Sequence, residues 1–229
     1  MLHIRDSLVD QFPPLLAIGG LKHAFVTRDL SVPEALTTDR AAALRALTPT
    51  HSHVCQQLGF SWAELVTAEQ VHGDAVAIAG VNDTRRLPNP IPGADGLITQ
   101  GPGAVLGIHV ADCAAVSLVD PEHRVIGLVH SGKAGSELGI VGKAIAVMKK
   151  SFGSKPRNII VHLGPCIRPP CYEIDIPNLI RSGALEAGIL SINYHDCGIC
   201  TAEQLKRYYS YRMEKGATGR MLALLGWEN

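Results

Sequence analysis

The sequence has no surplus of charge of either sign and no long hydrophobic run. Lys and Arg together number 21, as do Asp and Glu, so the formal net charge is zero. A chain without excess positive charge has no overall field that attracts nucleic acid or an anionic membrane surface. No apolar run approaches the roughly 20 residues that a membrane-spanning helix needs. We therefore expect neither nucleic acid nor a membrane as a partner.

The N-terminal segment also lacks the features of an export signal. MLHIRDSLVDQFPPLLAIGG carries Asp6, Asp10 and two prolines before any apolar run, whereas a signal peptide has a basic start and an uninterrupted apolar centre. The expected compartment is the cytoplasm. In that reducing environment we expect the six cysteines to be free thiols or metal ligands rather than disulfides.

The composition is that of a compact folded protein, with 46% hydrophobic and 18% charged residues. A length of 229 residues suits one large domain or two small ones and is ample for a substantial core. The strongest break is VNDTRRLPNPIPGADG at 81–96, which we interpret as a surface loop inside a single domain, residues 1–229, because strand-like segments lie on both sides. With no net charge and no coiled-coil pattern, a monomer is expected.

Short apolar segments rich in β-branched residues dominate the middle of the chain, and helical patterns flank them. Strands are predicted at 21–28, 64–71, 74–80, 104–111, 114–120, 124–131, 158–164 and 220–227. Helices are predicted at 39–59, 137–153, 176–188 and 201–216, with Pro49 as a candidate interruption of the first. The pattern favours the α+β or α/β class.

Three candidate metal ligands stand at the ends of strand-like segments: His72 in EQVHGD, Cys113 in ADC and His130 in VHSG. An Asp-Pro-Glu-His turn at 120–123 would place the segments that hold Cys113 and His130 side by side. One thiolate and two imidazoles suit Zn²⁺ and leave a fourth position for water or substrate, as in catalytic zinc sites. Copper accepts the same ligand types.

These three residues could also serve without a metal. A Cys on a buried strand is usually a small core residue, and a His at a strand end is often only hydrogen-bonded. Alternatively, Cys113 could be a nucleophile and His130 its base, as in thiol hydrolases. A second, partial metal motif is HDCGIC at 195–200, whose other half would be Cys166 and Cys171. Its C-x4-C half spans two prolines, which is poor spacing for zinc.

Several segments in order resemble one known family. They are HAFVTR (23–28), EQVHGD (69–74), GADGLIT (93–99), HVADCAAV (109–116), GLVHSG (127–132), GPCIRPPCYEI (164–174) and the C-terminal CT, SYR and TGR at 200–201, 210–212 and 218–220. These are similar to signature segments of the bacterial laccase-domain family, also called multicopper polyphenol oxidoreductase-like proteins. The resemblance implies an α+β fold, a single-domain layered α/β/β/α sandwich with mixed sheets. It also implies that His72, Cys113 and His130 hold the metal.

The resemblance further implies a function: zinc-dependent phosphorolysis of a purine nucleoside to the base and ribose 1-phosphate, with adenosine deamination and methylthioadenosine cleavage as related activities. One alternative is a copper-dependent polyphenol oxidase, the older label of the family. That chemistry needs several coppers and paired histidine motifs, whereas this chain has one His-x-His, HSH at 51–53. The remaining alternatives are a metal-free Cys-His hydrolase or amidase that edits peptidoglycan precursors, and a non-catalytic binding module.

Two further residues are candidates for catalysis beside Cys113. Asp112 adjoins Cys113 and is either an acid–base group that supports the site or a turn residue at the strand end. Gln70 lies two residues before His72, which places both on one face of a strand. From there it would contact a purine edge or a ribose hydroxyl, and the alternative is an ordinary surface glutamine.

The binding candidates are mostly arginines. Arg28, Arg212 and Arg220 are candidates for phosphate, because guanidinium forks match phosphate oxygens. Asp95, in a glycine-flanked loop, is a further candidate for substrate binding or for shaping the turn. His109 and His162 fall on apolar strands and are interpreted as buried structural residues.

The chain also departs from the family pattern. HSGKAG has no Trp or Arg where the family has Ala-Gly-Trp-Arg-Gly after its second histidine, and Lys133 supplies the only charge there. DLSVPE follows Arg28 in place of Gly-Gly-Val-Ser. These changes bear on the shape of the pocket and therefore on which nucleoside enters it.

Overall fold

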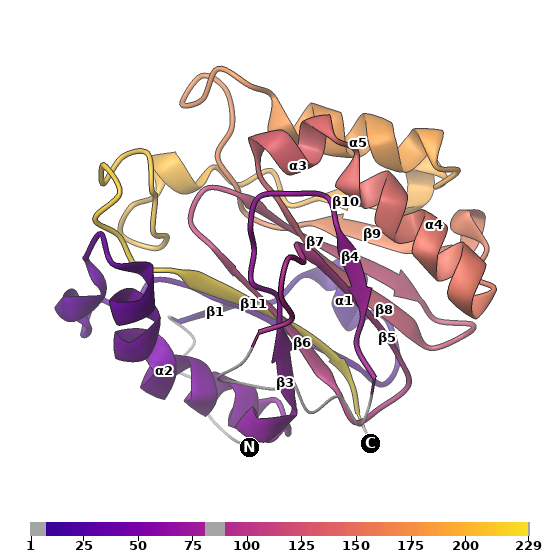
Figure 1. Ribbon diagram of the computed structural model, residues 1–229, viewed down its shortest axis with the longest axis horizontal. Helices are drawn as coiled ribbons and strands as arrows, with labels where there is room; N and C mark the ends of the chain where they lie inside the picture. The colour runs from indigo at the N-terminus through magenta and orange to yellow at the C-terminus, as the bar shows by residue number, and fades with distance from the viewer. Residues whose placement is uncertain (1–7, 81–89, 229) are drawn as a thin grey trace.

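Two mixed β-sheets pack face to face in the computed structural model, which describes residues 8–80 and 90–228 (Figure 1). The five-stranded sheet has the order β1 (Val9–Asp10), β2 (Leu21–Val26), β11 (Met221–Trp227), β6 (Val105–Val110) and β3 (Leu65–Thr67). The six-stranded sheet has the order β10 (Tyr194–Asp196), β9 (Ile160–Leu163), β7 (Ala114–Asp120), β8 (Val125–Ser131), β5 (Gly96–Gln100) and β4 (Val76–Ile78). Each sheet combines parallel and antiparallel pairs.

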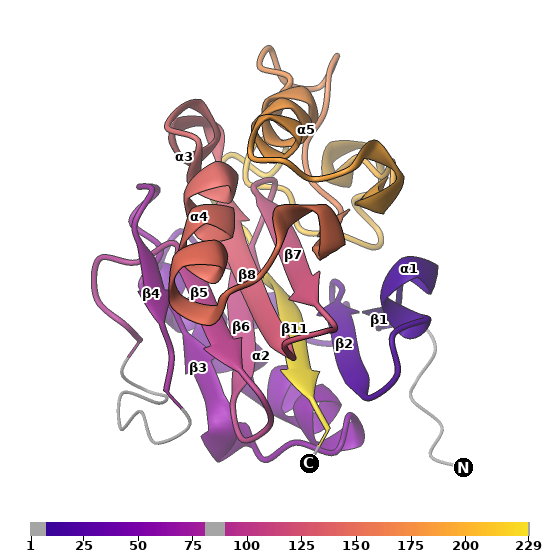
Figure 2. The ribbon, with the colours of Figure 1, turned by 90° about the vertical axis from the view of Figure 1, so that its right-hand side faces the viewer.

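Helices cover the outer faces of both sheets. The described helices are α1 (Pro13–Leu16), α2 (Arg40–Gln57), α3 (Lys133–Glu137), α4 (Ile140–Phe152) and α5 (Ile176–Glu186). Helices α3, α4 and α5 lie over the six-stranded sheet, and α2 lies on the far side of the five-stranded sheet (Figure 2). The predicted α+β class, with an α/β/β/α layering and mixed sheets, is confirmed.

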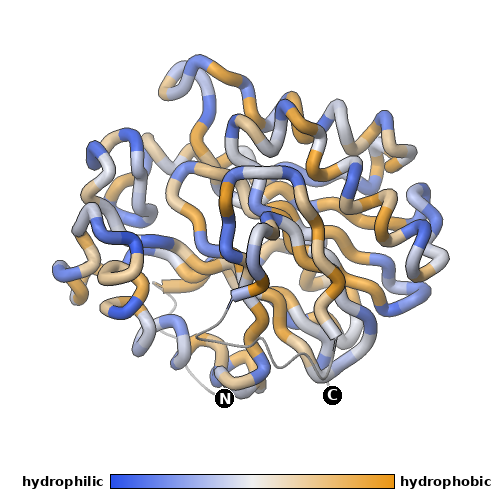
Figure 3. The backbone as a smooth tube through the Cα atoms, in the orientation of Figure 1, coloured by the Kyte–Doolittle hydropathy of each residue, from blue (hydrophilic) through white to orange (hydrophobic). Residues whose placement is uncertain are grey.

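The apolar runs of the sequence form the centre of this sandwich. Every residue of β6, β7, β8 and β11 is buried, because each of these strands has a sheet on one face and further structure on the other. A strand buried on both faces reads as a continuous apolar run rather than as an alternating one. Leu106 of β6 and Leu128 of β8 belong to one core cluster that joins the two sheets. Figure 3 shows the hydrophobic colour concentrated along these strands.

Most predicted elements are present, and several boundaries differ. The predicted strands at 64–71 and 74–80 shorten to β3 and β4, since the chain leaves the sheet to build the site described below. Helix α2 continues through Pro49 without a split. The predicted helix at 137–153 begins at Ile140 and ends before Gly153, which takes a positive φ of 73°. Of the predicted loop at 81–96, residues 81–89 lie outside the described residues.

The prediction of a helix at 201–216 is wrong. This segment forms a short 3-10 turn, Thr201–Glu203, followed by irregular turns. The backbone N–H of Arg212 donates to the Asp112 carboxylate at 2.7 Å, and the Ser210 hydroxyl donates to the same carboxylate at 3.0 Å. These tertiary contacts engage groups that a helix would have paired internally, and they override the local helix propensity.

Among the described residues, no helix is both long enough and apolar enough to cross a bilayer.

His162 is a buried core residue, as predicted. Its ring stacks on Phe12 at 4.2 Å between centroids. Burial lowers the pKa of His162 to about 3, and burial likewise lowers the pKa values of His23 and His51 to about 4. These histidines therefore stay neutral in the folded protein at pH values where the unfolded chain takes up protons.

The contribution of His23, His51 and His162 to the free energy of unfolding should be constant above about pH 6.5 and should decrease as the pH falls toward 4, because at these positions only the unfolded chain is protonated in that range. His162→Leu removes one such group and should reduce the slope of unfolding free energy against pH by about 1.4 kcal/mol per unit. Urea unfolding between pH 6 and 5 measures this slope. The exposed His53, changed to Leu, is the control. An unchanged slope in His162→Leu would contradict the prediction.

Candidate metal centre

His72, Cys113 and His130 meet at one point of the folded chain. One ligand atom from each residue lies within 4.8 Å of the others. The rings of His72 and His130 are 4.9 Å apart between centroids and nearly perpendicular, at 80°. The convergence that the sequence predicts is therefore present in the structure.

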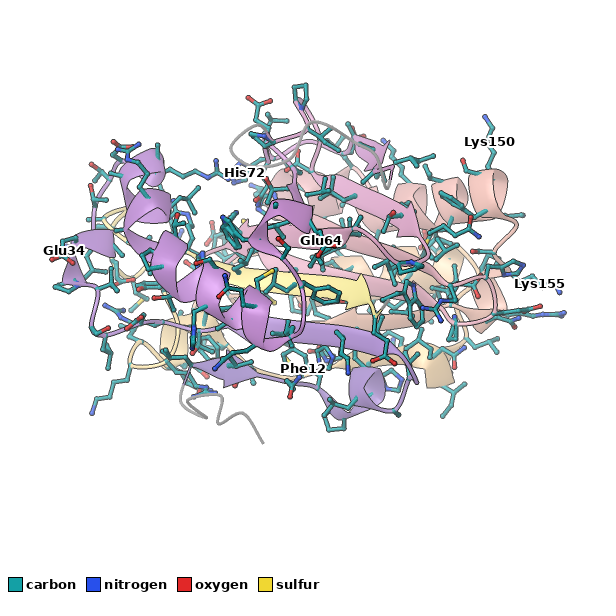
Figure 4. All side chains as sticks on the ribbon, turned by 90° about the horizontal axis from the view of Figure 1, so that it is seen from below. Phe12, Glu34, Glu64, His72, Lys150 and Lys155 are labelled. Atoms are coloured by element: carbon teal, nitrogen blue, oxygen red, sulfur yellow. The ribbon has the colours of Figure 1, made fainter. Side chains whose placement is uncertain are left out.

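The two sheets each contribute to this cluster. Cys113 lies between β6 and β7, and His130 lies on β8. Antiparallel pairing of β7 with β8 sets Ala114 opposite Ser131, so the predicted hairpin brings the thiol and the imidazole together. His72 comes from the loop after β3, an edge strand of the other sheet. Viewed from below, His72 and Phe12 lie at opposite edges of the sheets (Figure 4).

The loop that carries His72 has a left-handed backbone, with φ of 62° at Gln70 and 64° at His72. Such angles in residues other than glycine are strained by about 1–3 kcal/mol each and persist only where the surroundings hold them. The N–H of Gln70 donates to the carbonyl of Ala94 at 2.9 Å. The N–H groups of His72 and Gly73 donate to the Asp95 carboxylate at 3.0 and 2.7 Å.

The prediction that Gln70 and His72 share one face of a strand is therefore wrong, because the sheet ends at Thr67. The Gln70 amide instead hydrogen-bonds the backbone of His109, donating to its carbonyl at 2.6 Å and accepting from its N–H at 3.0 Å. Gln70 still lines the cleft beside the cluster. Its contact with substrate remains a prediction.

Asp95 holds His130 in place. Its fully buried carboxylate accepts a hydrogen bond from Nδ1 of His130 at 2.7 Å, an arrangement that orients metal-binding histidines in many proteins. Burial by itself would raise the pKa of Asp95, but hydrogen bonds from His130 and from the Gly73 and His72 N–H groups outweigh it and lower the pKa. Asp95 thus lies behind the cluster and outside the cleft lining, which corrects the prediction that it contacts substrate.

Hydrogen bonds within the cluster shift the pKa values of Cys113 and His130 in opposite directions. Burial would raise the pKa of Cys113, yet hydrogen bonds from His130 and His72 lower it to about 6. Burial would lower the pKa of His130, yet its hydrogen bonds to Asp95 and Cys113 raise it to about 9. Without metal, these shifts favour a Cys113 thiolate beside a protonated His130. The thiolate is the form that binds metal, whereas His130 must release a proton before it can do so.

The space between the ligands depends on a glycine. A Cβ atom at Gly132 would lie 2.8 Å from Sγ of Cys113 and 3.4 Å from Cδ2 of His72. The donor set of one thiolate and two imidazoles, together with this open space, fits a four-coordinate zinc or a copper ion.

Asp112 anchors the C-terminal segment to the site. It is buried, with a φ of 76°. Besides the Ser210 and Arg212 groups, the Thr201 hydroxyl donates to its carboxylate at 2.7 Å. Asp112 is thus a turn residue at a strand end, as one of its two predicted roles requires, and it is also a tertiary anchor. Its acid–base role remains a prediction.

The cluster opens into a cleft of about 590 Å³, a typical volume for a small-molecule site. Five cationic side chains line it, namely Arg40, Lys133, Arg212, Lys215 and Arg220. The lining also includes Tyr172, Tyr211, Ile167 and Ile176. Asp112 is the only carboxylate among the described lining residues, and its oxygens are engaged. The cleft therefore favours an anionic ligand with an apolar or aromatic part.

The predicted arginines divide into two groups. Arg212 and Arg220 line the cleft, whereas Arg28 lies outside its lining, paired with Glu214 at 2.9 Å and placed over the ring of Tyr209. Its predicted contact with phosphate is corrected accordingly. The sequence did not point to Arg40, which begins α2 and belongs to none of the family segments. His109 is buried as predicted, but it also forms part of the cleft wall.

Known proteins share this fold and are similar in sequence to this chain. A family model described as multi-copper polyphenol oxidoreductase laccase matches residues 35–175 and 173–228. A purine nucleoside phosphorylase of Deinococcus radiodurans is 30% identical over 93% of this chain and 92% of its own length. The purine nucleoside phosphorylase ORF3 of Streptomyces griseus is 33% identical over 77% of this chain and 79% of its own length. The crystal structure of YlmD from Geobacillus stearothermophilus, 23% identical, matches with a TM-score of 0.82 over 97% of this chain and 100% of that one.

Replacing Asp95 with Asn should lower the affinity of the cluster for Zn²⁺ by roughly 10–100-fold, because the amide holds His130 with less charge complementarity. Competition with a chromophoric chelator measures the affinity. The matched control is Asp120→Asn, since Asp120 is also buried and accepts from Nδ1 of His123 at 2.9 Å, but outside the cleft. Equal zinc affinities of the two variants would contradict the assigned role of Asp95.

Proposed function

The chain belongs to the multi-copper polyphenol oxidoreductase laccase family, and within it we propose that this protein is a zinc-dependent purine nucleoside phosphorylase. The supporting observation is that the His72–Cys113–His130 cluster opens into a cleft lined by cationic and aromatic side chains. Curated relatives are named purine nucleoside phosphorylases, which supports the activity, and the metal is our proposal. The substrates would be a purine nucleoside and phosphate.

Arg40 and Arg220 are the proposed phosphate ligands. In the described part of the chain neither has a carboxylate within 4 Å. Burial lowers the pKa of each, and the charge of Arg40 lowers the pKa of Arg220 further, so the two guanidinium groups repel each other. A bound phosphate would relieve this repulsion and accept charge-assisted hydrogen bonds from both.

Arg220 is also prepared for this role by its backbone contacts. Its Nη1 donates to the carbonyls of Thr218 and Gly219 at 2.9 and 2.8 Å, and its guanidinium lies 5.8 Å from the ring centroid of Tyr211. Holding the guanidinium before phosphate arrives reduces the entropy lost on binding.

The aromatic side of the cleft is the proposed place of the purine. Tyr172 and Tyr211 present rings on which a base can stack, a contact worth about 1–3 kcal/mol for nucleic-acid bases. Ile167 and Ile176 add apolar surface, which suits the methylthio group of methylthioadenosine as well as the ribose of adenosine, inosine or guanosine.

In phosphorolysis a phosphate oxygen forms a bond to C1′ of the ribose while the N9–C1′ bond breaks. The electron pair of the broken N9–C1′ bond leaves with the purine. Arg40 and Arg220 would hold the attacking phosphate, and the tyrosines would hold the base. A zinc ion on His72, Cys113 and His130, when bound, supplies Lewis-acid polarisation and lowers the pKa of a coordinated water. The same chemistry supports adenosine deamination as a second activity of this cleft.

Zinc is proposed over copper oxidase chemistry because of the ligand inventory. Among the described residues, only two groups of three candidate ligands occur, and just one contains histidine. Oxidation of phenols by several coppers would need more histidine clusters than these.

The thiolate–imidazolium pair favours one rival function. A Cys113 pKa of about 6 beside His130 is the state in which Cys-His hydrolases attack their substrates. Chelation separates the two functions, because a hydrolase would retain or gain activity in the metal-free protein, whereas the phosphorylase would lose it.

Metal-loaded protein incubated with adenosine, inosine or guanosine and phosphate should release free base and ribose 1-phosphate, followed by chromatography. His72→Ala and Cys113→Ala should bind no metal at this cluster and should lose at least 100-fold in kcat/KM, since each removes a ligand. Inosine formed from adenosine without phosphate would reveal the deaminase. Oxygen uptake with a phenol and copper, or no turnover of any nucleoside by metal-replete protein, would overturn the proposal.

Replacing Arg40 or Arg220 with Ala should raise the KM for phosphate by roughly 10–100-fold, the magnitude of one or two lost charge-assisted hydrogen bonds. Initial rates at varied phosphate concentration measure it. Arg45→Ala is the matched control, because Arg45 lies on α2 with Arg40 but is 71% exposed. A phosphate KM that stays equal to the wild-type value in both variants would remove these residues from the phosphate site.

A further inference from the structure

A second group of candidate ligands lies outside the cluster already described. Four cysteines gather around the ends of β9 and β10, at positions 166, 171, 197 and 200, and a parallel bridge pairs Cys166 with Cys200. Only two of them face each other through their thiols: Sγ of Cys171, Sγ of Cys200 and a carboxylate oxygen of Glu203 all lie within 4.8 Å of one another. Of the partial metal motif found in the sequence, Cys171 comes from the C-x4-C half and Cys200 from the HDCGIC half. Glu203 joins them, although the motif did not include it.

The remaining two cysteines do not join this group. Cys166 is fully buried in the core around α4 and α5, and burial raises its pKa far above the ordinary range. Cys197 faces a different hollow, lined also by Asp10 and His195, and burial raises its pKa to about 11. Both therefore act as protonated thiols, and the C-x-x-C spacing itself does not build a site.

The group is open to solvent on one side. Cys200 is buried at 5% exposure, Cys171 is half-buried and Glu203 is exposed. In the described part of the chain the Glu203 carboxylate has no ion-pair partner. Desolvation, the Cys200 sulfur and the Glu203 carboxylate all raise the pKa of Cys171. Among the described ion pairs no cation neutralises the Glu203 carboxylate, so it is available to a metal ion beside the two thiols.

We propose that Cys171, Cys200 and Glu203 form a second metal site, which takes a zinc-like divalent cation with water as its fourth ligand. Two sulfurs and one carboxylate oxygen within 4.8 Å match the tetrahedral Zn²⁺ donor set, with bonds of about 2.3 Å to sulfur and 2.0–2.2 Å to oxygen. On binding, the two thiol protons pass to solvent and no electron is transferred. The open side of the group is the entry path of the ion.

The position of this site assigns it a structural task. Cys171 directly precedes Tyr172, which lines the cleft, and Cys200 directly precedes Thr201, whose hydroxyl donates to Asp112. An ion between them would clamp the loop at 166–172 to the segment at 200–212. Those two stretches supply Ile167, Tyr172, Tyr211 and Arg212 to the cleft wall.

Metal analysis of the purified full chain, loaded with zinc and freed of excess, tests the site without any assay of turnover. Wild-type protein should bind two zinc ions. Cys171→Ser and Cys200→Ser should each bind one, His72→Ala should also bind one, and the double variant with His72→Ala and Cys171→Ser should bind none. Glu203→Gln, on the surface, should weaken the second ion by about tenfold and guards against misfolding of the cysteine variants.

Cobalt gives a second measurement. Cobalt-loaded His72→Ala should keep a thiolate-to-cobalt absorption band. Adding Cys171→Ser to this variant should remove the band. Adding Cys197→Ser instead is the matched control and should leave the band unchanged. One zinc ion in the wild-type protein that is lost in His72→Ala and kept in Cys171→Ser would overturn the proposal. So would two ions in Cys171→Ser, or a disulfide between Cys171 and Cys200 found by mass spectrometry of unreduced protein. A site confirmed in a protein without nucleoside turnover would stand independently of the proposed function.

Discussion

The buried carboxylate of Asp95 is the interaction on which the site depends. It accepts from Nδ1 of His130 and from the N–H groups of His72 and Gly73, and the Asp95 carbonyl accepts from the N–H of His130 at 2.7 Å. One residue thus holds both the loop that carries His72 and the His130 side chain of β8. Burying a carboxylate is costly unless its oxygens are hydrogen-bonded, and here these donors offset that cost. The strained backbone of His72 persists because Asp95 holds it.

Asp112 performs the corresponding task for the other side of the cleft. Its carboxylate accepts from Thr201, Ser210 and Arg212, which belong to the C-terminal segment that bears Tyr211. Asp95 therefore orients the two histidines of the cluster, and Asp112 holds the C-terminal segment that forms part of the cleft wall. In the described chain, four of the five non-glycine residues with positive φ line this cleft, namely Gln70, His72, Asp112 and Lys215. Local strain is thus concentrated where the chemistry is proposed.

Most of the charged residues that line the cleft are cationic, and the Asp95 carboxylate lies behind the lining. The negative groups are satisfied by hydrogen bonds behind or beside the cleft, while the cationic side chains face into it. An anion that enters meets Arg40 and Arg220, which have no carboxylate partner among the described residues. This arrangement explains how a protein with no net charge can present a strongly cationic site, since only the local distribution acts on a small ligand.

The sequence by itself determined the strands of the core, because runs such as those of β6, β7 and β8 are predominantly apolar and a turn joins the last two. It also pointed to the three candidate ligands, since the Val-His-Gly, Asp-Cys and His-Ser-Gly motifs stand at the ends of strand-like segments. Only the tertiary structure decided the rest. Residues 201–216 have a helical pattern but pair with Asp112 instead. Arg40 reaches the cleft from a helix with no motif, Arg28 turns away to Glu214, and Asp95 lies behind His130 rather than in the cleft. Hydrophobic periodicity is a local property that a sequence displays directly, whereas the partner of a polar side chain depends on which distant segment the fold brings within about 3 Å of it.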